Sequence, residues 1–587
     1  MAIERRLGTE ENPDIIDQGK SIEIEAEAPT FEDQLMESLE VTIKDDEIII
    51  DEAQVEEEEQ VPFEANLAEY LDDYVLGSIS KKLISDVDSD KESRKEWMKT
   101  YTDGLKYLGM RFDEQRSQPF EGSSGVIHPI LAESVTQFQA QAYKELLPAQ
   151  GPVKTQIIGQ RNANTEMQAE RVSEFMNYYI MNEMPEYDPE LDQLLFYLPL
   201  SGSAFKKVYY DASKRRPVSK FVPAEDLLVP YEATDLLSAE RVTHIVSMSS
   251  NEVRKLQLSG FYMDTELTGN DVEIRDSVSE EIDKIQGMEP EYSNDEQRKL
   301  YEIHTVEDIE GFEDLDENGE PTGLKLPYII TIDESSQTVL SIRRNYEPED
   351  PIRNKINYFV QYKFLPGLGF YGLGLSHMIG GLSKATTSIL RQLIDAGTLS
   401  NLPAGFKARG IRIRDEASPL QPGEFRDVDA PGGALRDSLM PLPYKEPSSV
   451  LFSLLGLLVQ SGQRFASIAD MNVGDSNAAM PVGTTVALLE KGTKVMSAIH
   501  KRLHYSQKSE FKILARVFGE FLPPVYPYET GSGSREIKLE DFDRKVDIIP
   551  VSDPNIFSMS QRVVLAQELL AMVQSNPEIH GPQGLYE

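Results

Sequence analysis

The chain has 587 residues, which corresponds to about three or four domains of typical size, and its 40% apolar content is that of folded domains rather than of a disordered chain. The formal net charge is −42, which argues against a protein that reads nucleic-acid sequence, because such proteins neutralise phosphates with a basic surface. The absence of cysteine excludes a disulfide framework, thiolate zinc sites and a cysteine nucleophile.

The sequence predicts no contact with a membrane. Its most apolar run, Val450 to Val459, is about half of the roughly 18 consecutive apolar residues that span a bilayer. Residues 1–13 lack the apolar core of a signal peptide. We therefore expect a soluble protein that is made in the cytoplasm.

Residues 1–62 form the first predicted region, an acidic arm. Up to residue 60 it holds twenty-one Asp and Glu against four Lys and Arg. Short apolar islands such as Ile48–Ile50 cannot offset the entropy of ordering so charged a segment. We predict that the arm is mostly disordered, with a segment that docks on a partner as the alternative.

Residues 63–370 are predicted to be an α+β region. The spacing of apolar residues indicates helices that begin near Ala65, near Trp97, after Pro129 and at about Thr165. Residues 265–298 form a charged insertion with little periodicity. Strand-like runs lie on either side of it, at Ala204–Tyr210, Ser219–Val222, Glu302–Asp308 and Leu326–Ile332.

The character of the sequence changes at Tyr371. A helix is predicted from Leu375 to Leu399, followed by a stretch rich in Pro, Gly and Arg at 401–447. A second apolar helix, a small-residue loop, a long helix, a strand region and a final amphipathic helix come next. Their predicted ranges are 448–470, 471–483, 484–522, 523–558 and 559–573. The fold class expected for the whole chain is α+β and predominantly helical.

Gly367, Gly369 and Gly372 reproduce the spacing of a dinucleotide-binding fingerprint, between a strand-like run and a helix. That fingerprint also needs a second strand that ends in an acidic residue. The residue at the required distance, Asp395, falls inside the predicted helix instead. We therefore interpret the glycines as letting the helix start close to its neighbour.

Two further patterns resemble metal sites. Residues 314–319 copy the first half of a calcium loop, but Lys325 stands where a bidentate glutamate is needed, so a hairpin turn is the simpler interpretation. His500 and His504 share one helix face, but the residues between them are basic, and we expect a solvated or interface face. The sequence also lacks a nucleophile elbow, a Walker loop and a credible set of Ser, His and Asp. We therefore predict that the protein is not an enzyme and that it holds no cofactor and no metal ion.

The order of elements after Tyr371 resembles the stem–clip–stem core of portal proteins, the ring-shaped head-to-tail connectors of tailed double-stranded DNA bacteriophages. Tyr371-Gly-Leu-Gly374 resembles the start of the first stem helix, Asn401-Leu-Pro403 the passage into the clip, and Gly483-Thr-Thr-Val-Ala487 the segment after the tunnel loop. Other segments resemble portals of podoviruses of the P22 type, and the likeness spans about residues 64–575 by order and spacing. These segments are Ser93–Trp97, Gln118–Gly122, His128–Leu131, Ser201–Lys206, Val222–Asp226 and Val546–Pro554.

The resemblance implies a portal fold in which each predicted region has a place. Residues 63–370 would be the wing, with stem helices at 371–400 and 448–470, a clip at 401–447 and a tunnel loop at 471–483. The long helix 484–522 and the strands of 523–558 would complete the wing, and 559–587 would begin a crown that is short or missing. Such subunits form a closed ring, usually of twelve.

The resemblance also implies which residues do the work. Channel and tunnel-loop residues would be Asn472, Asp475, Ser476, Asn477 and Met480, with Lys491 and Lys494 as contacts for DNA phosphates. The clip rim would present Lys407, Arg409, Arg412, Arg414, Arg426 and Arg436. Stem packing would involve Leu382, Ile389, Leu393, Leu451, Leu455 and Leu458, although periodicity alone also allows an ordinary buried core helix.

The partners implied are double-stranded DNA in transit, the large terminase subunit, a head–tail adaptor, and the major capsid and scaffolding proteins. The location implied is the portal vertex of the virion. An acidic channel suits this role, because each Lys or Arg that displaces counterions strengthens the hold on DNA. The alternatives are another head–tail structural protein, such as an adaptor or capsid-lining protein, and a cytosolic nucleotide-binding enzyme.

Overall fold

The computed structural model of the chain describes residues 61–110, 120, 123–158, 161–267, 277–288, 297–315, 320–401, 442, 444–465, 482–530, 533–543 and 546–551. It also describes the backbone of short strands at 39–44, 47–52, 405–407, 412–413, 428–429 and 439–441. The side chains of 465, 482–497 and 530 do not belong to this description.

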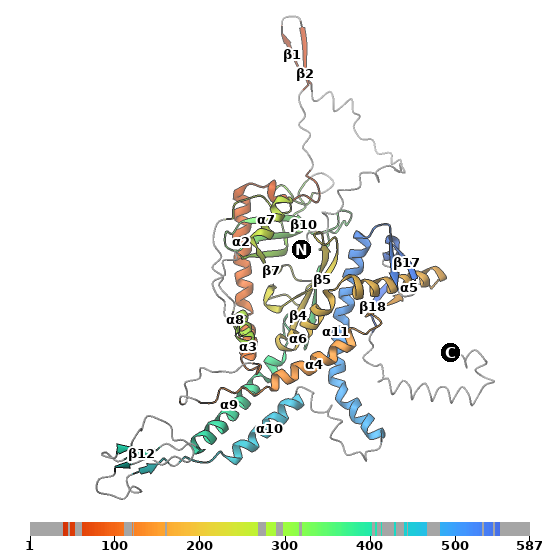
Figure 1. Ribbon diagram of the computed structural model, residues 1–587. Coiled ribbons are helices and arrows are strands. Elements are labelled where there is room, and N and C mark those ends of the chain that lie inside the picture. The colour runs from red at the N-terminus through yellow and green to blue at the C-terminus, as the bar shows by residue number, and fades with distance from the viewer. Residues whose placement is uncertain are drawn as a thin grey trace, which may run out of the picture.

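The body of the molecule is built in four layers, two of which are antiparallel sheets (Figure 1). Helix α2 (Asp73–Ser93) covers one face of a five-stranded sheet with the order β10-β9-β8-β7-β6. The other face of that sheet packs on a three-stranded sheet, β11-β4-β5, and helices cover the far side of this second sheet. The strands are β4 (Ser203–Asp211), β5 (Arg216–Val222), β6 (Leu227–Leu228), β7 (Val242–Ser249), β8 (Gln297–Glu307), β9 (Leu326–Asp333), β10 (Val339–Arg344) and β11 (Phe359–Lys363).

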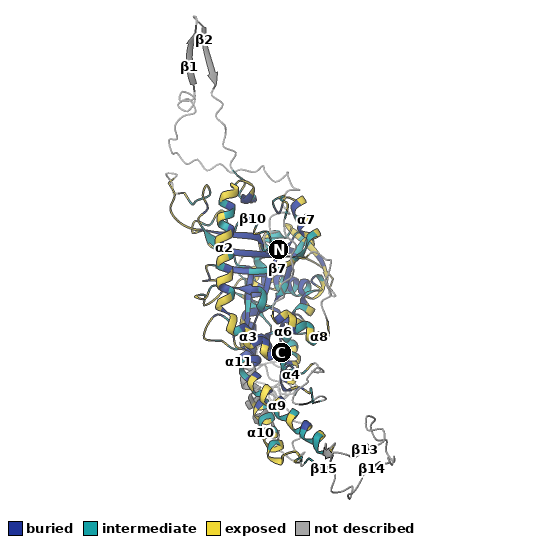
Figure 2. Cartoon of the chain, turned by 90° about the vertical axis from the view of Figure 1, so that its left-hand side faces the viewer, coloured by how far each residue is buried: buried dark blue, intermediate teal, exposed yellow. Residues whose placement is uncertain are grey.

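Strand β4 lies at the centre of this arrangement and is buried on both faces. Because successive side chains of a strand point to opposite faces, Ala204 and Val208 join the core under the helices, whereas Phe205 and Tyr209 join the core between the sheets. Figure 2 shows the resulting buried sheet behind the exposed outer face of α2.

The sequence prediction located four helices of the first half and missed two others before the insertion, α6 and α7 (Ser250–Leu258). The helix predicted to begin near Ala65 is α2, which begins at Asp73. Helices α3 (Lys95–Lys106), α4 (Ile130–Leu146) and α5 (Ala163–Tyr178) occupy the predicted positions, and α5 continues into a π-helical turn at Tyr179–Glu183. Helix α6 (Tyr187–Ser201) was not predicted. Its apolar residues lie on several sides and are buried, so it lacks the one-sided pattern that identifies a surface helix.

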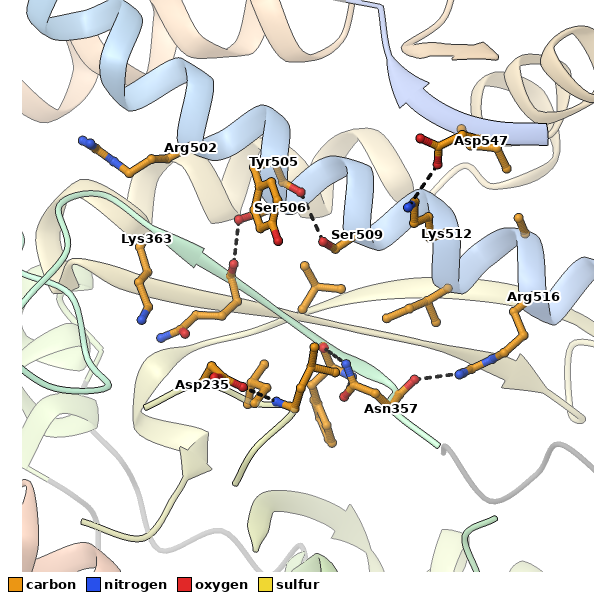
Figure 3. A pocket seen from close by; sticks show the side chains of 18 of the residues that line it. Asp235, Asn357, Lys363, Arg502, Tyr505, Ser506, Ser509, Lys512, Arg516 and Asp547 are labelled. Atoms are coloured by element: carbon orange, nitrogen blue, oxygen red, sulfur yellow. Dashed lines mark hydrogen bonds and ion pairs between the residues drawn. The ribbon is translucent and has the colours of Figure 1, made fainter. Parts of the chain in front are cut away.

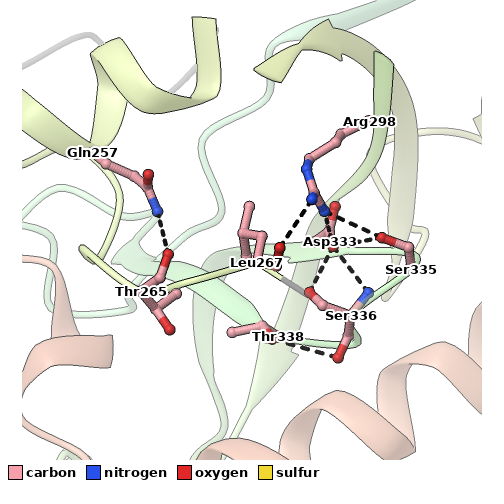
Figure 4. A network of polar contacts seen from close by, with 8 residues as sticks. All are labelled: Gln257, Thr265, Leu267, Arg298, Asp333, Ser335, Ser336 and Thr338. Carbon is pink, nitrogen blue, oxygen red and sulfur yellow. Dashed lines mark hydrogen bonds and ion pairs between the residues drawn. The ribbon is translucent and has the colours of Figure 1, made fainter. Parts of the chain in front are cut away.

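The charged insertion contains more structure than the sequence indicated, because α8 (Ser277–Gln286) lies within it. A polar network holds the chain just before residue 268 (Figure 4). Arg298 donates to the Leu267 carbonyl at 3.0 Å and pairs with the buried Asp333 carboxylate at 3.2 Å. The same carboxylate accepts from the Ser335 and Ser336 hydroxyls, so one buried anion ties the end of β9 to the start of the insertion.

The acidic arm contains one element that the sequence prediction did not foresee. Strands β1 (Leu39–Lys44) and β2 (Glu47–Glu52) pair antiparallel, with Val41 opposite Ile50 and Ile43 opposite Ile48. Cross-strand pairs of β-branched residues favour such a hairpin, and the expectation that the arm is mostly disordered stays a prediction. The rest of the arm lies outside the described residues.

The second half contains the predicted helices with modest changes at their ends. Helices α9 (Leu375–Asn401), α10 (Ser449–Phe465) and α11 (Val482–Phe521) match the three predictions. Strands β16 (Val525–Thr530) and β17 (Gly533–Lys538) form a hairpin, and β18 (Val546–Pro550) pairs with β3 (Val153–Ile157). The predicted helix at 559–573 lies outside the described residues.

The structure is mixed α and β, with about 48% helix and 21% strand, which is compatible with the expected α+β class. Among the helices that the structure describes, none has an apolar stretch long enough to cross a membrane.

Candidate functional site

The candidate site is the pair of helices α9 and α10, which leaves the body as an antiparallel hairpin with the short strand β12 near its tip (Figure 1). The body holds the start of α9 through Trp97 of helix α3. The Trp97 ring stacks on Tyr371 at 4.8 Å and on His377 at 5.4 Å between ring centroids, and its indole N–H donates to the Gly372 carbonyl at 3.1 Å. Burial lowers the pKa of His377, which favours the neutral ring at this junction.

Close backbone contacts explain the glycines before α9. A Cβ on Gly374 would lie 2.6 Å from the Gly202 nitrogen, and one on Gly372 would lie 2.7 Å from the Leu365 carbonyl oxygen. Gly202 itself has a φ of 87°, which favours glycine. The sequence interpretation of these glycines is confirmed at Gly372, whereas a Cβ on Gly369 would meet nothing within 4 Å.

Residues 123–128 run beside the middle of α9 and fix it to the body. The Asp395 carboxylate accepts from the Ser124 amide at 2.6 Å, and the Arg391 guanidinium donates to the Val126 carbonyl at 2.7 Å. Asp395 therefore lies in the helix, as predicted, and serves as a backbone anchor.

Helix α10 packs on α9 with only one of its faces. Leu451, Leu455 and Leu458 are half-buried on that face, as are Leu382, Ile389 and Leu393 of α9. Farther along, a Cβ on Gly462 would lie 2.9 Å from Leu382 Cδ2, so the end of α10 is in tight contact with α9. The six residues predicted for stem packing thus share one structural unit.

Apolar side chains on both flanks of that face of α10 are exposed. Val450 is 73% exposed and Leu457 59% exposed on one flank, and Phe452 is 70% exposed on the other. Arg464 carries the helix's one formal charge. An apolar helix is normally buried, so the alternative of an ordinary core helix is wrong for the isolated chain.

The segment between α9 and α10, the predicted clip, contains two short antiparallel pairs. Strand β12 (Gly405–Lys407) pairs with β15 (Leu439–Pro441), and β13 (Arg412–Ile413) pairs with β14 (Val428–Asp429). Lys407 and Arg412 therefore lie in strands. Arg409, Arg414, Arg426 and Arg436 lie outside the described residues.

The structure does not describe the predicted tunnel loop. Asn472, Asp475, Ser476, Asn477 and Met480 all fall outside the described residues. Lys491 and Lys494 lie in α11, but only the backbone is described there. The contacts proposed for them stay predictions.

The prediction for His500 and His504 was a solvated or an interface face of the helix, and the solvated alternative is wrong, because both side chains are buried inside the body. His500 Nδ1 contacts the Glu145 carboxylate on α4, and its ring lies 6.3 Å from the Phe138 ring. The basic residues between the two histidines suggested that this part of the helix is exposed. Helical spacing, however, places Lys501 on a different face from the two histidines, so Lys501 is exposed while the histidines face inward.

Two buried ion networks next to β4 were missed by sequence reasoning. Lys206 Nζ lies 3.0 Å from Glu510 Oε1 of α11, with both side chains fully buried. Its neighbour Lys207 points to the other face and pairs with Glu302 of β8 at 2.7 Å. Glu302 also contacts His304 Nε2 at 2.7 Å, and the Lys207 ammonium holds the pKa of Glu302 well below its usual range despite burial. The signal available in the sequence was a Lys-Lys pair inside an apolar strand.

Comparison with known proteins finds no family model that matches this chain and no curated protein with significant similarity to it.

Proposed function

We propose that this chain is the subunit of a phage portal, a ring-shaped channel at one capsid vertex through which double-stranded DNA is packaged, retained and ejected. The observation that carries the proposal is the pair of exposed apolar flanks on α10. A closed ring in which copies meet head to tail uses two different surfaces of every subunit. Val450 and Leu457 on one flank and Phe452 on the other would supply those two surfaces.

The shape of the hairpin supports the same proposal. Trp97, Gly372 and Asp395 anchor α9 to the body while the clip strands lie at the distal end. In the portal arrangement α9 and α10 form the stem, and the clip forms the rim that meets the terminase during packaging and a head–tail adaptor afterwards. The body forms the wing, which adjoins the capsid and scaffolding proteins.

The channel is proposed to be passive. A net charge of −42 limits phosphate affinity, which suits a duplex that must move. ATP hydrolysis would come from the terminase, so we propose no catalytic residue and no cofactor in this chain.

Electron microscopy and native mass spectrometry of the purified chain test the proposal. We expect rings of about twelve copies with a central hole wide enough for duplex DNA. A compact monomer at micromolar concentration would refute it.

A matched pair of variants tests the role of the α10 flanks. Leu457→Glu places an unpaired carboxylate in the proposed interface and should raise the concentration for half-assembly on the order of 100-fold. Leu258→Glu is the control, because Leu258 is 71% exposed on α7 (Ser250–Leu258) of the body. Equal assembly of the two variants would contradict the assignment of the interface.

A further inference from the structure

A groove of about 1660 Å³ lies between α11, the edge strand β11, β18 and residues 235–238 (Figure 3). Its lining is apolar at several positions, including Leu236, Phe359, Val360, Ile513 and Ile548. No part of the portal proposal uses this groove.

The groove is unusual in so acidic a chain because cations outnumber carboxylates along its walls. The basic lining residues are Lys355, Lys363, Lys501, Arg502, Lys512 and Arg516, and the acidic ones are Asp235, Asp541 and Asp547.

The three carboxylates are already engaged. Asp547 accepts from Lys508 at 2.7 Å and pairs with Lys512 at 3.0 Å. Asp541 pairs with Arg171, and Asp235 accepts from the Leu237 and Ser238 amides at 2.8 Å each. The lining as a whole still has three more basic than acidic side chains.

The contacts of three cations are with neutral groups. Arg502 donates to the Phe364 carbonyl at 2.9 Å, Lys355 donates to the Ala239 carbonyl at 2.6 Å, and Lys363 lies 5.5 Å from the centre of the Phe370 ring. Within the described part of the chain, no carboxylate lies in ion-pair distance of these three. Burial lowers the pKa of Lys355 and Lys363, although Asp235 opposes that shift, and burial also lowers the pKa of Arg502. An anion in the groove would therefore relieve a desolvated positive charge.

We propose that the groove is a docking site for the acidic N-terminal arm of this same chain, residues 1–60. The arm carries a net charge of −17, from twenty-one acidic and four basic residues. Within it, residues 21–27 (SIEIEAE) alternate apolar and acidic side chains. In an extended conformation such a segment presents Ile22 and Ile24 on one side and Glu23, Glu25 and Glu27 on the other. This pattern matches a groove with an apolar floor and cationic walls.

The arm joins the body next to one end of the groove. Arg344 donates to the Pro62 and Phe63 carbonyls at 3.1 and 2.9 Å, and the Phe63 ring lies 5.2 Å from the Tyr346 ring. Asn345, between Arg344 and Tyr346, accepts from the Ile356 amide at 3.0 Å, and Lys355 precedes Ile356 in the groove lining.

The length of the arm is sufficient for docking. Thirty-four residues separate Glu27 from Pro62. Even with residues 39–52 folded back as a hairpin, the remaining 20 can span roughly 65 Å at full extension. This span is enough for the arm to reach from Pro62 to the groove lining near Lys355 of its own chain.

Disulfide crosslinking in the full chain tests the proposal directly, because the natural sequence contains no cysteine. Ser21→Cys would be combined with Ser238→Cys at the groove wall, where Ser238 is exposed. The matched control combines Ser21→Cys with Ser259→Cys, an exposed serine at the end of α7 on the body. We expect the groove pair to crosslink at least about tenfold faster than the control pair, because docking raises the local concentration of the arm. Whether the product is a crosslinked monomer or a dimer tells whether the arm docks on its own chain or on another.

The arm variant Glu23→Gln, Glu25→Gln, Glu27→Gln leaves the folded body unchanged, so it separates docking from folding. It should lower the groove crosslinking rate about tenfold, since three ion pairs contribute a few tenths to one kcal/mol each. Equal rates for the groove and control pairs, or no effect of the three glutamines, would overturn the proposal. Protection of the Ser238→Cys thiol from maleimide by duplex DNA in this arm variant, without crosslinking, would assign the groove to nucleic acid instead. None of these outcomes depends on ring formation.

Discussion

The contact between α11 and β4 provides the sharpest test of the packing, because it depends on one buried carboxylate. Glu510 is fully buried and accepts from three side chains: Lys206 at 3.0 Å, the Ser219 hydroxyl at 2.6 Å and the Tyr362 hydroxyl. The Lys206 ammonium has no exposure to water, and its other neighbour is the Tyr187 ring at 3.8 Å. Burial, together with the Glu510 charge, raises the pKa of Tyr362 well above its usual range, so this hydroxyl stays a donor.

Glu510→Gln keeps an acceptor for Ser219 and Tyr362 but leaves Lys206 as an uncompensated buried charge. Breaking one side of such a pair costs about 3–5 kcal/mol. The variant should therefore accelerate hydrogen exchange of the β4 and α11 amides by roughly 100- to 4000-fold, where exchange occurs through opening of this unit.

The double variant Lys206→Met with Glu510→Gln removes the charge as well as its partner. It should recover most of the lost protection, because replacing a buried pair by apolar groups of similar size is often nearly neutral. The argument would be refuted if Glu510→Gln changed exchange by less than about fivefold, a change of roughly 1 kcal/mol. It would also fail if the double variant were as unstable as the single one.

Two further predictions concern the body. Gly374→Ala should lower the free energy of unfolding by about 1–3 kcal/mol, because the added methyl meets the Gly202 backbone. The control is Gly381→Ala, also in α9, where the added methyl meets nothing within 4 Å and should stabilise the fold by about 0.5–1 kcal/mol. The urea midpoints of unfolding of the two variants should therefore shift in opposite directions, and a shift in the same direction would contradict the prediction. Burial lowers the pKa of His244 to about 3, so the folded state stays neutral where the unfolded state takes up a proton near pH 6.5. Stability from His244 is thus complete above pH 6.5 and should fall by about 2 kcal/mol between pH 6.5 and 5. His244→Phe should remove its share of the dependence of the unfolding free energy on pH across this range. Buried His304, whose pKa is also lowered, leaves a dependence of the same sign in the variant. An unchanged pH dependence would contradict the assignment to His244.

Sequence reasoning worked best where one local pattern decides the structure. The apolar spacing of residues 375–399 located α9 to within two residues at its end, because a long one-sided helix has a strong periodic signal. The glycine interpretation at Gly372 also held, because the residues that follow form a helix rather than a βαβ unit.

The failures share a physical cause, which is that the deciding contact comes from distant sequence. Lys206 is buried because Glu510, about three hundred residues away, meets it from α11. His500 is buried because α4 covers it with Phe138 and Glu145. Helix α6 escaped prediction for a related reason: its second half, residues 194–200, is apolar on all sides, so the exposed Asp188, Asp192 and Gln193 mark its period only near its start.

The positions of the basic side chains show how the net charge of −42 is distributed over the molecule. In the body, basic side chains are drawn inward to meet acids. Lys206 and Lys207 are buried in ion pairs, and Arg241 bridges Asp86 and Asp90 of α2 at 2.8 and 3.0 Å. A cation engaged in this way does not attract the phosphates of passing DNA, and because each buried Lys–Glu pair is neutral, the net charge of −42 stays with the other side chains. The groove beside α11 differs, because three of its cations, Arg502, Lys355 and Lys363, contact neutral groups. In the proposed ring, a basic groove left open would attract the DNA. If the arm docks there as proposed, its acidic side chains would remove that attraction, which is what the proposed passive channel requires.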